Sequence, residues 1–221
     1  MSNLSKYLPD QTFKTPLLKR VFDALISFVF SLTLLPIMLI IYFMMKAEGL
    51  IRPDTRGPLF YSEIRISQGR PFKLSKFRIF KTSIIDKTLI EKGFIHTKPL
   101  EQNLDNLTFT GQFLKKVYLD ELPQIFSVLL GKMSLVGPRP WNLVDYNNEI
   151  AQGIYRKRII KAGLTGLVQI SKGDNDSHKN GVKLDNQYIT FCQSNPPWKI
   201  LLLDLKILAK SILVILKARG L

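Results

Sequence analysis

The sequence predicts an α+β protein in which an N-terminal membrane-inserted helix, broken at Pro36, joins a small domain of mixed helices and short strands. A long apolar run at residues 21–45 predicts the membrane helix. Two short strand patterns flank a turn signal at residues 68–71, and helical patterns fill much of the rest. We therefore expect a membrane helix within residues 1–45 and a second domain at residues 46–221.

Composition narrows the classes of partner. The chain has 221 residues and a net charge of +15, and a basic excess of this size implies nucleic acid, an anionic membrane surface or phosphorylated substrates. The charge is spread along the chain and no nucleic-acid recognition motif accompanies it, so we expect no nucleic-acid partner. The lone cysteine, Cys192, excludes an intrachain disulfide, and one cysteine with His96 and His178 argues against a zinc site.

The apolar run is interrupted by Asp23 and a few hydroxyl groups only. Thr15 is suited to cap the helix and Pro16 to begin it. The run is too long for a cleavable signal peptide and lacks a small-residue cleavage site. Residues 21–45 are therefore expected to stay in the mature protein as a membrane element.

Pro36 lies inside this run, where it removes a backbone hydrogen bond and bends a helix. Basic residues stand on both sides of the run, namely Lys14, Lys19 and Arg20 before it and Lys46, Arg52 and Arg56 after it. Because positive charge favours the cytoplasmic side, a helix that enters and leaves the same leaflet keeps both flanks inside. Hydropathy alone favours the alternative, a single-pass anchor.

Beyond the membrane element, residues 59–67 and 72–80 read as two strands joined at residues 68–71. Residues 82–110 lack clear periodicity and are expected to form a loop with short helical pieces. A short helix is predicted at residues 112–116.

Further along, a longer helix is predicted at residues 120–130, with Asp120 able to cap it and Pro123 tolerated in its first turn. Residues 141–158 read as helical. Residues 163–170 read as a glycine-punctuated loop that leads into a strand.

The C-terminal segment, residues 198–219, is predicted to be an amphipathic helix. Lys206, Lys210 and Lys217 fall within roughly 40° of one another on a helical wheel, and leucine and isoleucine fill most of the remainder. Such a helix is suited either to the membrane interface or to packing on the core of the protein itself.

Asp120 and Glu121 form an adjacent acidic pair, followed by Arg139 between Pro138 and Pro140. A carboxylate can attack phosphorus or hold a divalent metal, and a guanidinium can grip phosphate oxygens. The competing interpretation is that the two acids only stabilise a helix start and that the arginine only forms a salt bridge. Two acids in a basic neighbourhood favour phosphoryl chemistry.

The run from Phe113 to Pro140, with its D-E-L-P-Q and G-x-M-S-L-V-G-P-R-P motifs, resembles the bacterial sugar transferase family of monotopic polyprenyl-phosphate phosphoglycosyl transferases. Further matches extend the resemblance to roughly residues 17–221. They are Lys19-Arg20, Asp23, Lys76-Phe77-Arg78, the loop at residues 163–169, and Asp204-Leu205-Lys206.

This resemblance implies an enzyme that moves a sugar 1-phosphate from a UDP-sugar to undecaprenyl phosphate, releasing UMP and initiating a surface polysaccharide or glycoconjugate such as capsule, exopolysaccharide or lipopolysaccharide. By resemblance, Asp120 is the nucleophile that attacks the β-phosphorus and carries a covalent phosphosugar. Glu121 would either help hold Mg²⁺ with Asp120 or manage protons. The resemblance also implies a re-entrant helix, amphipathic interfacial helices, and a catalytic domain that faces the cytoplasm at the bacterial inner membrane.

Other positions are assigned to substrate and phosphate binding on the same basis. They are Arg139, Lys76, Arg78, Lys116, Gly163, Thr165 and Gln169. Glycines at residues 163 and 166 would let backbone approach a phosphate or nucleotide closely, or would only form a tight turn.

The chain departs from the family pattern at several positions. Tyr118 stands where serine is common, Lys132 replaces an aspartate, and Lys161-Ala162 replaces Arg-Pro. These departures motivate an alternative function, a catalytically impaired relative that scaffolds a glycan-assembly complex. Because Asp120, Glu121 and Arg139 are retained, the active enzyme is favoured.

Overall fold

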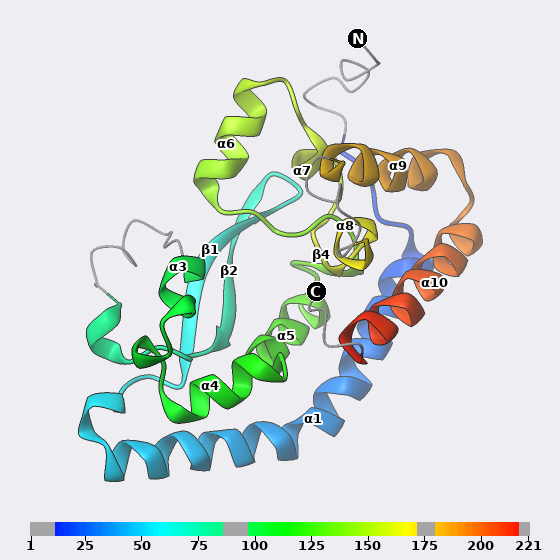
Figure 1. The fold of residues 1–221 in the computed structure, drawn as a ribbon. Helices are drawn as coiled ribbons and strands as arrows, with labels where there is room; N and C mark the ends of the chain where they lie inside the picture. Colours follow the sequence, from blue (N-terminus) through cyan, green and yellow to red (C-terminus); the bar gives the residue numbers. More distant parts are fainter. Residues whose placement is uncertain (1–11, 86–96, 172–179, 217–221) are drawn as a thin grey trace. The chain divides into compact units, whose positions relative to one another are not determined.

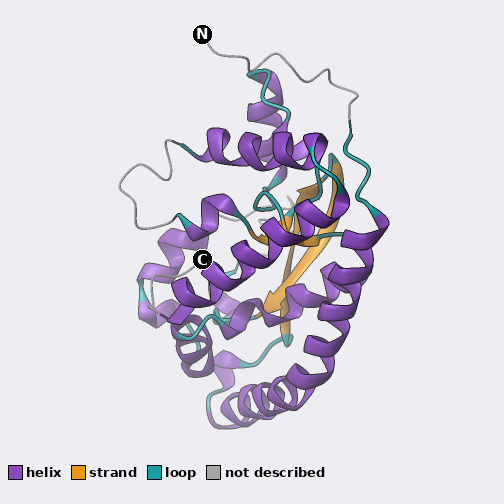
Figure 2. Ribbon diagram, turned by 90° about the vertical axis from the view of Figure 1, so that its right-hand side faces the viewer, coloured by secondary structure: helices purple, strands orange, loops and turns teal. Residues whose placement is uncertain are grey.

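A computed structural model describes residues 12–85, 97–171 and 180–216 (Figure 1). The chain packs as two compact units. Unit 1 contains Met1–Ser27, Arg65–Phe72 and Ser127–Leu221, and unit 2 contains Phe28–Ile64 and Lys73–Phe126. Figure 2 shows that helices make up most of the described chain and that strands are few, so the predicted mixed helix and strand composition is confirmed. The predicted division at residue 45 concerns the membrane boundary rather than packing, and it stays a prediction.

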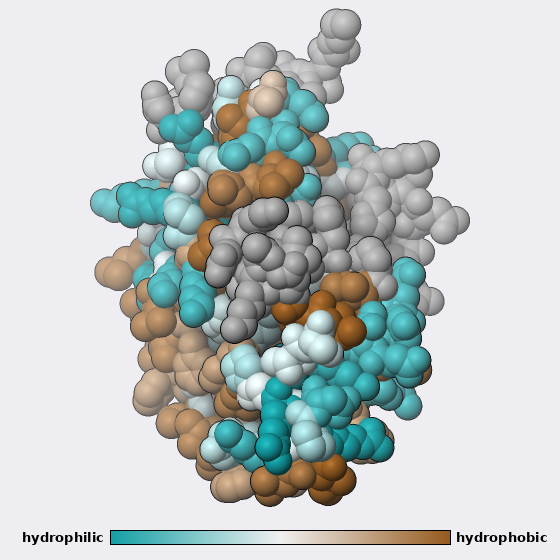
Figure 3. All heavy atoms as spheres, turned by 90° about the vertical axis from the view of Figure 1, so that its left-hand side faces the viewer, coloured by the Kyte–Doolittle hydropathy of each residue, from teal (hydrophilic) through white to brown (hydrophobic). Residues whose placement is uncertain are grey.

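Helix α1, Leu17–Ile51, is the long apolar helix that the sequence predicts. It begins directly after Thr15 and Pro16, as expected. Within the described residues it is the one helix long and apolar enough to cross a membrane, and only 17% of its most apolar stretch is buried. The helix continues through Pro36 and is not broken there as predicted, because a proline removes one backbone hydrogen bond while the remaining bonds can still hold the helix. The re-entrant path itself stays a prediction. In Figure 3, hydrophobic side chains gather along the lower left margin and at the bottom, with hydrophilic side chains between these two groups.

The predicted strands form a hairpin, β1 (Phe60–Ser67) with β2 (Arg70–Phe77). The turn is shorter than expected and consists of Gln68 and Gly69, both with positive φ (51° and 73°). This two-residue turn geometry matches the twist of the strands that it joins. Arg70 and Pro71, expected in the turn, already belong to β2.

Besides parts of these two strands, unit 2 contains several short helices. They are η2 (Pro53–Thr55), η3 (Thr82–Ile84), α3 (Thr97–Gln102), η4 (Leu104–Asn106), α4 (Phe109–Lys116) and η5 (Leu119–Gln124). Their core is built on Ile41, Met45, Phe77, Ile79, Phe80, Leu107 and Leu114. The loop with helical pieces predicted at residues 82–110 is confirmed outside residues 86–96, which lie beyond the described residues. The helix predicted at residues 112–116 is confirmed as α4, which begins earlier.

The single helix predicted at residues 120–130 is wrong. The segment forms the 3₁₀-helix η5, followed by α5 (Ile125–Leu129), and Tyr118 rather than Asp120 occupies the cap position, with a left-handed φ of 58°. A 3₁₀-helix has three residues per turn, so Leu119 and Leu122 lie on one face. Both pack against the core of unit 2, which favours the tighter helix.

Unit 1 contains a second sheet, in which β3 (Ser134–Val136) pairs in parallel with β4 (Gly163–Thr165). Its helices are α6 (Leu143–Ala151), α7 (Arg156–Ile159), α8 (Leu167–Ile170), α9 (Gly181–Ser194) and α10 (Pro197–Leu216). The helix predicted at residues 141–158 is interrupted between α6 and α7, where Gly153 has a φ of 75°.

The prediction of a loop that leads into a strand at residues 163–170 is wrong. The segment begins with the strand β4, and the short helix α8 follows. Gly137 and Gly163 explain the strand. The amide of Gly137 donates to the carbonyl of Thr165 at 2.9 Å, and that of Gly163 donates to Pro138 at 2.9 Å. A Cβ on Gly163 would lie 2.1 Å from the nitrogen of Gly137, so glycine is required for the two backbones to approach this closely.

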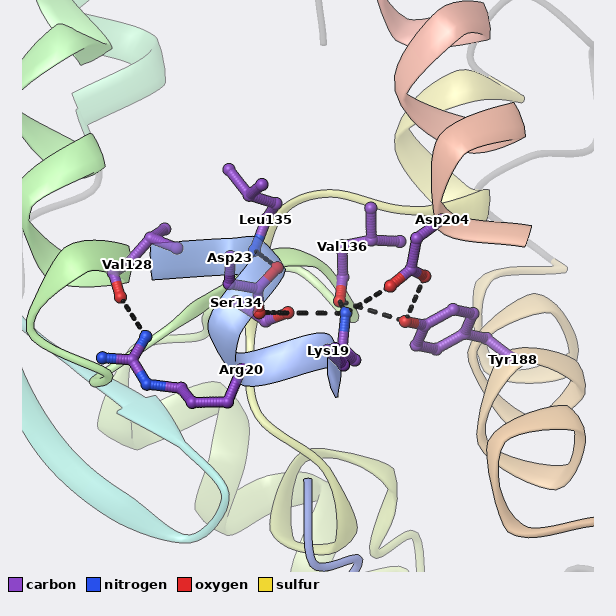
Figure 4. Close-up of polar contacts among 9 residues, drawn as sticks. All are labelled: Lys19, Arg20, Asp23, Val128, Ser134, Leu135, Val136, Tyr188 and Asp204. Carbon is purple, nitrogen blue, oxygen red and sulfur yellow. Dashed lines mark hydrogen bonds and ion pairs between the residues drawn. The ribbon is translucent and has the colours of Figure 1, made fainter. Parts of the chain in front are cut away.

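A buried polar network holds the first turns of α1 in unit 1 (Figure 4). Lys19 Nζ donates to Asp204 Oδ2 on α10 at 2.5 Å and to the carbonyl of Val136 at 3.3 Å. Tyr188 on α9 donates to Asp204 Oδ1 at 2.7 Å. Asp23 accepts from the hydroxyl of Ser134 at 2.6 Å. The network explains why an apolar helix carries a lysine and an aspartate in its first turns.

Helix α10 buries one face in unit 1. Ile200, Asp204, Ile207 and Ser211 are buried, at the spacing of a helical stripe. Of the two alternatives predicted for this helix, packing on the protein's own core is therefore confirmed for the buried face. The remaining faces expose lysines and large apolar side chains, namely Lys206, Lys210, Leu202, Leu205, Ile212 and Leu213. Their contact with a membrane stays a prediction, and Lys217 lies outside the described residues.

Candidate active site

An ion pair between β2 and η5 lies at the centre of the predicted site in unit 2. Lys76 Nζ lies 2.6 Å from Glu121 Oε1, and the two side chains are 22% and 33% exposed. Lys76 was predicted to bind phosphate, but in this structure its charge compensates the second carboxylate of the acidic pair. Both side chains remain accessible enough to exchange this contact for a substrate.

Asp120 is half-buried at the start of η5. Burial raises the pKa of its carboxyl group to about 6, with smaller contributions from the negative charges of Glu121 and Glu101, while Lys76 opposes the rise. The group is therefore mostly ionised at neutral pH but poorly hydrated. A carboxylate of this kind is suited to attack an electrophile or to accept a cation.

The acidic pair is fixed by its neighbours. Leu119 and Leu122 pack on the core of unit 2 and leave Asp120 and Glu121 on other faces of the short helix. The preceding helix, α4, lies so close to the chain after β2 that a Cβ on Gly111 would meet the carbonyl oxygen of Ile79 at 2.2 Å.

The start of α4 is capped from the end of α1. The carboxylate of Glu48 accepts from the amides of Phe109 at 2.7 Å and Thr110 at 2.9 Å, and Thr108 accepts from Gly111 at 2.8 Å. These bonds satisfy amides that a helix start otherwise leaves unpaired. Within unit 2, the C-terminal part of α1 is thus joined to the helix that leads directly to the acidic pair.

Arg78 is buried and holds backbone together. Its guanidinium donates to the carbonyls of Pro58 at 2.8 Å, Phe80 at 2.5 Å and Thr55 at 2.8 Å. These contacts account for a structural role, and the predicted phosphate contact of Arg78 stays a prediction. The strand predicted at residues 72–80 ends earlier, because β2 stops at Phe77 and Arg78 lies directly after it.

Lys116 lies exposed at the end of α4. Its neighbour Lys115 donates to the carbonyl of Glu101 at 2.7 Å and lies 3.4 Å from the Glu101 carboxylate. Lys116 therefore lies at the surface, four residues before Asp120. Its predicted phosphate contact stays a prediction.

In unit 1, Arg139 is exposed, whereas the prolines on both sides of it are buried. The backbone around it is held by hydrogen bonds, because the carbonyl of Pro138 accepts from Gly163 at 2.9 Å and that of Arg139 accepts from Lys157 Nζ at 3.0 Å. The structure therefore presents the Arg139 side chain from a fixed loop, as the two prolines predict.

The predicted loop at residues 163–169 packs against the Arg139 loop within unit 1. Thr165 is buried, and its hydroxyl lies 2.6 Å from that of Ser211. A Cβ on Gly166 would meet the carbonyl oxygen of Gly137 at 2.3 Å. The glycines thus serve close packing of backbone on backbone, and their predicted contact with a nucleotide stays a prediction. Gln169 is 1% exposed, and neither polar atom of its side chain has a hydrogen-bond partner in the described structure.

One charged cluster was missed by the sequence prediction. Arg156 pairs with Glu149 on α6 and with Asp185 on α9, and Lys157 pairs with Asp185. All four side chains are buried. Burial lowers the pKa of Lys157, and the charge of Asp185 opposes this. Two signals in the sequence were available. They are Asp185 within an otherwise helical pattern and the successive basic residues Arg156, Lys157 and Arg158 before the glycine loop.

The predicted site residues divide between the units. Unit 2 brings together Asp120, Glu121 and Lys76, while unit 1 brings together Arg139 and the loop at residues 163–169. The described residues contain no group of three or more histidine, cysteine or acidic side chains able to hold a metal. Mg²⁺ commonly binds through one or two carboxylates together with substrate phosphates, so the half-buried Asp120–Glu121 pair fits this ion.

Comparisons with known proteins identify the family to which the chain belongs. The family model described as bacterial sugar transferase matches residues 14–218. A UDP-glucose:undecaprenyl-phosphate glucose-1-phosphate transferase of Klebsiella pneumoniae is 31% identical over 86% of this chain and 38% of its own length. The undecaprenyl-phosphate galactose phosphotransferase of Salmonella typhimurium is 30% identical over 92% of this chain and 41% of its own.

A shorter relative matches along most of its length. The exopolysaccharide production protein ExoY of Sinorhizobium fredii is 33% identical over 91% of this chain and 87% of its own. By contrast, the chain spans about two fifths of the length of several other curated relatives (38%, 41% and 42%). The family match covers nearly the whole of the present sequence, so this chain belongs to the bacterial sugar transferase family.

Proposed function

We propose that this protein is a membrane-embedded phosphoglycosyl transferase that transfers a sugar 1-phosphate from a UDP-sugar to undecaprenyl phosphate and releases UMP. The observation that carries the proposal is the half-buried Asp120 carboxylate beside the Lys76–Glu121 ion pair. The names of the relatives, which include a UDP-glucose:undecaprenyl-phosphate glucose-1-phosphate transferase and an undecaprenyl-phosphate galactose phosphotransferase, support these substrates.

In the first step, a carboxylate oxygen of Asp120 attacks the β-phosphorus of the UDP-sugar. A bond forms between that oxygen and phosphorus, and the bond from phosphorus to the bridging oxygen breaks, so UMP leaves. The sugar phosphate remains on Asp120 as an acyl phosphate. Partial burial favours this step, because a poorly hydrated carboxylate loses little solvation on approaching phosphorus.

In the second step, a phosphate oxygen of undecaprenyl phosphate attacks the same phosphorus and Asp120 leaves as a carboxylate. The product is a polyprenyl diphosphate sugar, and the enzyme returns to its starting state. Both substrates are anionic, so cations must offset their repulsion from the carboxylate. Lys76 supplies one such charge at the acidic pair, and Arg139 is proposed to bind phosphate from its fixed loop.

Asp120 and Glu121 are proposed to hold Mg²⁺, which when bound would neutralise charge on the pyrophosphate. Lys76 is then proposed to release Glu121 and contact substrate phosphate. The apolar helix α1 would place the enzyme in the bacterial inner membrane, where its lipid substrate lies, with the catalytic part facing the cytoplasm. The basic flanks of α1 support this orientation.

The test is UMP release by the full chain in nanodiscs, supplied with Mg²⁺, undecaprenyl phosphate and a panel of UDP-sugars. We expect release with one or a few sugars, and its loss with EDTA and in Asp120→Asn. Asp105→Asn, which changes an exposed acid on η4, is the matched control and should retain activity. Absence of release with every sugar of the panel would instead support a scaffolding role.

A further inference from the structure

The Arg139 loop in unit 1 is held by a buried charge that nothing in the proposed chemistry requires. Lys157 Nζ donates to the carbonyl of Arg139 at 3.0 Å and to Asp185 Oδ2 at 2.9 Å. The side chains of Lys157 and Asp185 are 4% and 3% exposed. A lysine this deeply buried is costly unless its charge is paired and its donors are used.

The cluster is balanced in charge. Arg156 Nη1 donates to Asp185 Oδ2 at 2.7 Å, and its guanidinium also pairs with both oxygens of Glu149. Two cations thus face two carboxylates. The ring of Trp141 lies against both cations, with centroid distances of 4.8 Å to Arg156 and 4.9 Å to Lys157. The carboxylate of Asp185, the carbonyl of Arg139 and the ring of Trp141 thus all contact the end of the Lys157 side chain.

The hydrogen bond from Lys157 is made to the backbone of Arg139, the residue of this loop whose side chain is exposed and proposed to bind phosphate. Backbone bonds hold the neighbouring carbonyls, since Gly163 donates to Pro138 at 2.9 Å and Ile66 donates to Trp141 at 2.8 Å. The carbonyl of Arg139 lies between these two and is held by a side chain from α7. Without Lys157, the apex of the loop would lose the bond that fixes its central peptide.

We infer that Lys157, oriented by Asp185, is a positioning residue that fixes the Arg139 peptide and so aims its guanidinium at substrate phosphate. The effect on phosphate binding rests on the proposed function. The fixing of the Arg139 peptide rests only on the hydrogen bond from Lys157. Positioning of this kind is valuable because misplacing a binding group by about 1 Å can cost about 10²-fold in rate.

The test variant is the pair Lys157→Met with Asp185→Asn. It removes the donor to Arg139 but keeps the charges of Arg156 and Glu149 balanced, so no unpaired charge stays buried. Lys183→Met, at an exposed lysine on α9, is the matched control. All variants are compared as full chains in nanodiscs.

Hydrogen exchange of peptides covering residues 134–144 reports the loop directly. We expect faster exchange there in the double variant and unchanged exchange in Lys183→Met. We also expect kcat/KM for the UDP-sugar to fall about 10- to 100-fold. When Arg139→Ala is already present, adding the same two changes should lower kcat/KM by less than about threefold. The reason is that Lys157 and Asp185 act on the rate through the Arg139 side chain, which this variant lacks.

Unchanged exchange at residues 134–144 would overturn the inference. So would a loss that adds fully to that of Arg139→Ala, since it would show a general effect on the fold. If the double variant does not fold, Lys157→Arg, which keeps the buried cluster balanced in charge but replaces the ammonium donor by a guanidinium, is expected to give a smaller increase at the same peptides. Failure of the wild-type chain to release UMP would count against the proposed function, while hydrogen exchange would still decide the positioning claim.

Discussion

Lys76 Nζ lies 2.6 Å from Glu121 Oε1, so a cation from β2 offsets one carboxylate of an adjacent acidic pair. Burial raises the pKa of the other carboxyl group, Asp120, to about 6, and the positive charge of the same lysine limits this rise. One ion pair thus influences both the ionisation of the proposed nucleophile and the charge that a substrate phosphate meets.

The first prediction concerns pH. Asp120 must be ionised to attack phosphorus, so kcat/KM for the UDP-sugar should fall as the pH decreases through about 6. Lys76 lowers the pKa of Asp120, and Lys76→Met should therefore move this acidic limb to higher pH. Lys73→Met, at an exposed lysine on the same strand, should leave it in place. An acidic limb unaffected by Lys76→Met would assign the titration to another group.

The second prediction concerns the stability of Asp120→Asn. A pKa that is higher in the folded chain than in the unfolded chain means that protonated Asp120 favours folding, and this contribution is lost as the pH rises through about 6. Asparagine mimics the protonated state. The variant should therefore lose at least about 10³-fold in activity, yet should be more stable than wild type by about 1 kcal/mol at pH 7.5.

Thermal unfolding at pH 7.5 and pH 5 measures this difference. The advantage of Asp120→Asn should shrink at pH 5, where the wild-type carboxyl group is largely protonated. If Asp120→Asn is inactive and also less stable than wild type at pH 7.5, the prediction is wrong, and the lost activity reflects a disturbed fold.

The third prediction concerns Arg78. Two of its three hydrogen bonds to backbone carbonyls are buried and the third is partly buried, so Arg78→Met should lower the free energy of unfolding by roughly 3–5 kcal/mol. Arg70→Met, at an exposed arginine on β2, should change it by less than about 0.5 kcal/mol. Equal stability of the two variants in a denaturation experiment would reopen a role for Arg78 in phosphate binding.

The fourth prediction concerns the path of α1. In a Cys192→Ser background, single cysteines are placed at Thr12 and Arg52, on either side of the apolar helix. The proposed re-entrant path predicts that an impermeant maleimide labels both in inverted membrane vesicles and neither in intact spheroplasts. Labelling of Thr12→Cys alone in spheroplasts would show a single-pass anchor.

The sequence predicted those features that depend on local pattern. The apolar run, the hairpin around Gln68 and Gly69, and α4 follow from hydropathy, alternation and turn residues close together in the chain. The 3₁₀ geometry of η5 was not predictable in this way, because it depends on Leu119 and Leu122 packing against a core assembled from distant segments.

The same distinction applies to the candidate site. Motifs identified Asp120, Glu121 and Arg139, but the pairing of Lys76 with Glu121 and the raised pKa of Asp120 depend on burial and on contacts between separate elements. The bond from Lys157 to Arg139 and the structural use of Arg78 are likewise tertiary. Residue type alone could not distinguish a cation that binds backbone from one that binds phosphate.

The most direct measurement is the release of UMP in a single turnover without any lipid acceptor, using the UDP-sugar that supports turnover. If Asp120 forms a covalent intermediate, wild type should release up to one equivalent of UMP per active site, and the sugar phosphate should remain bound to the peptide that contains Asp120. Asp120→Asn should release none. UMP release that requires undecaprenyl phosphate in the wild-type chain, with no labelled peptide, would show direct transfer and contradict the account.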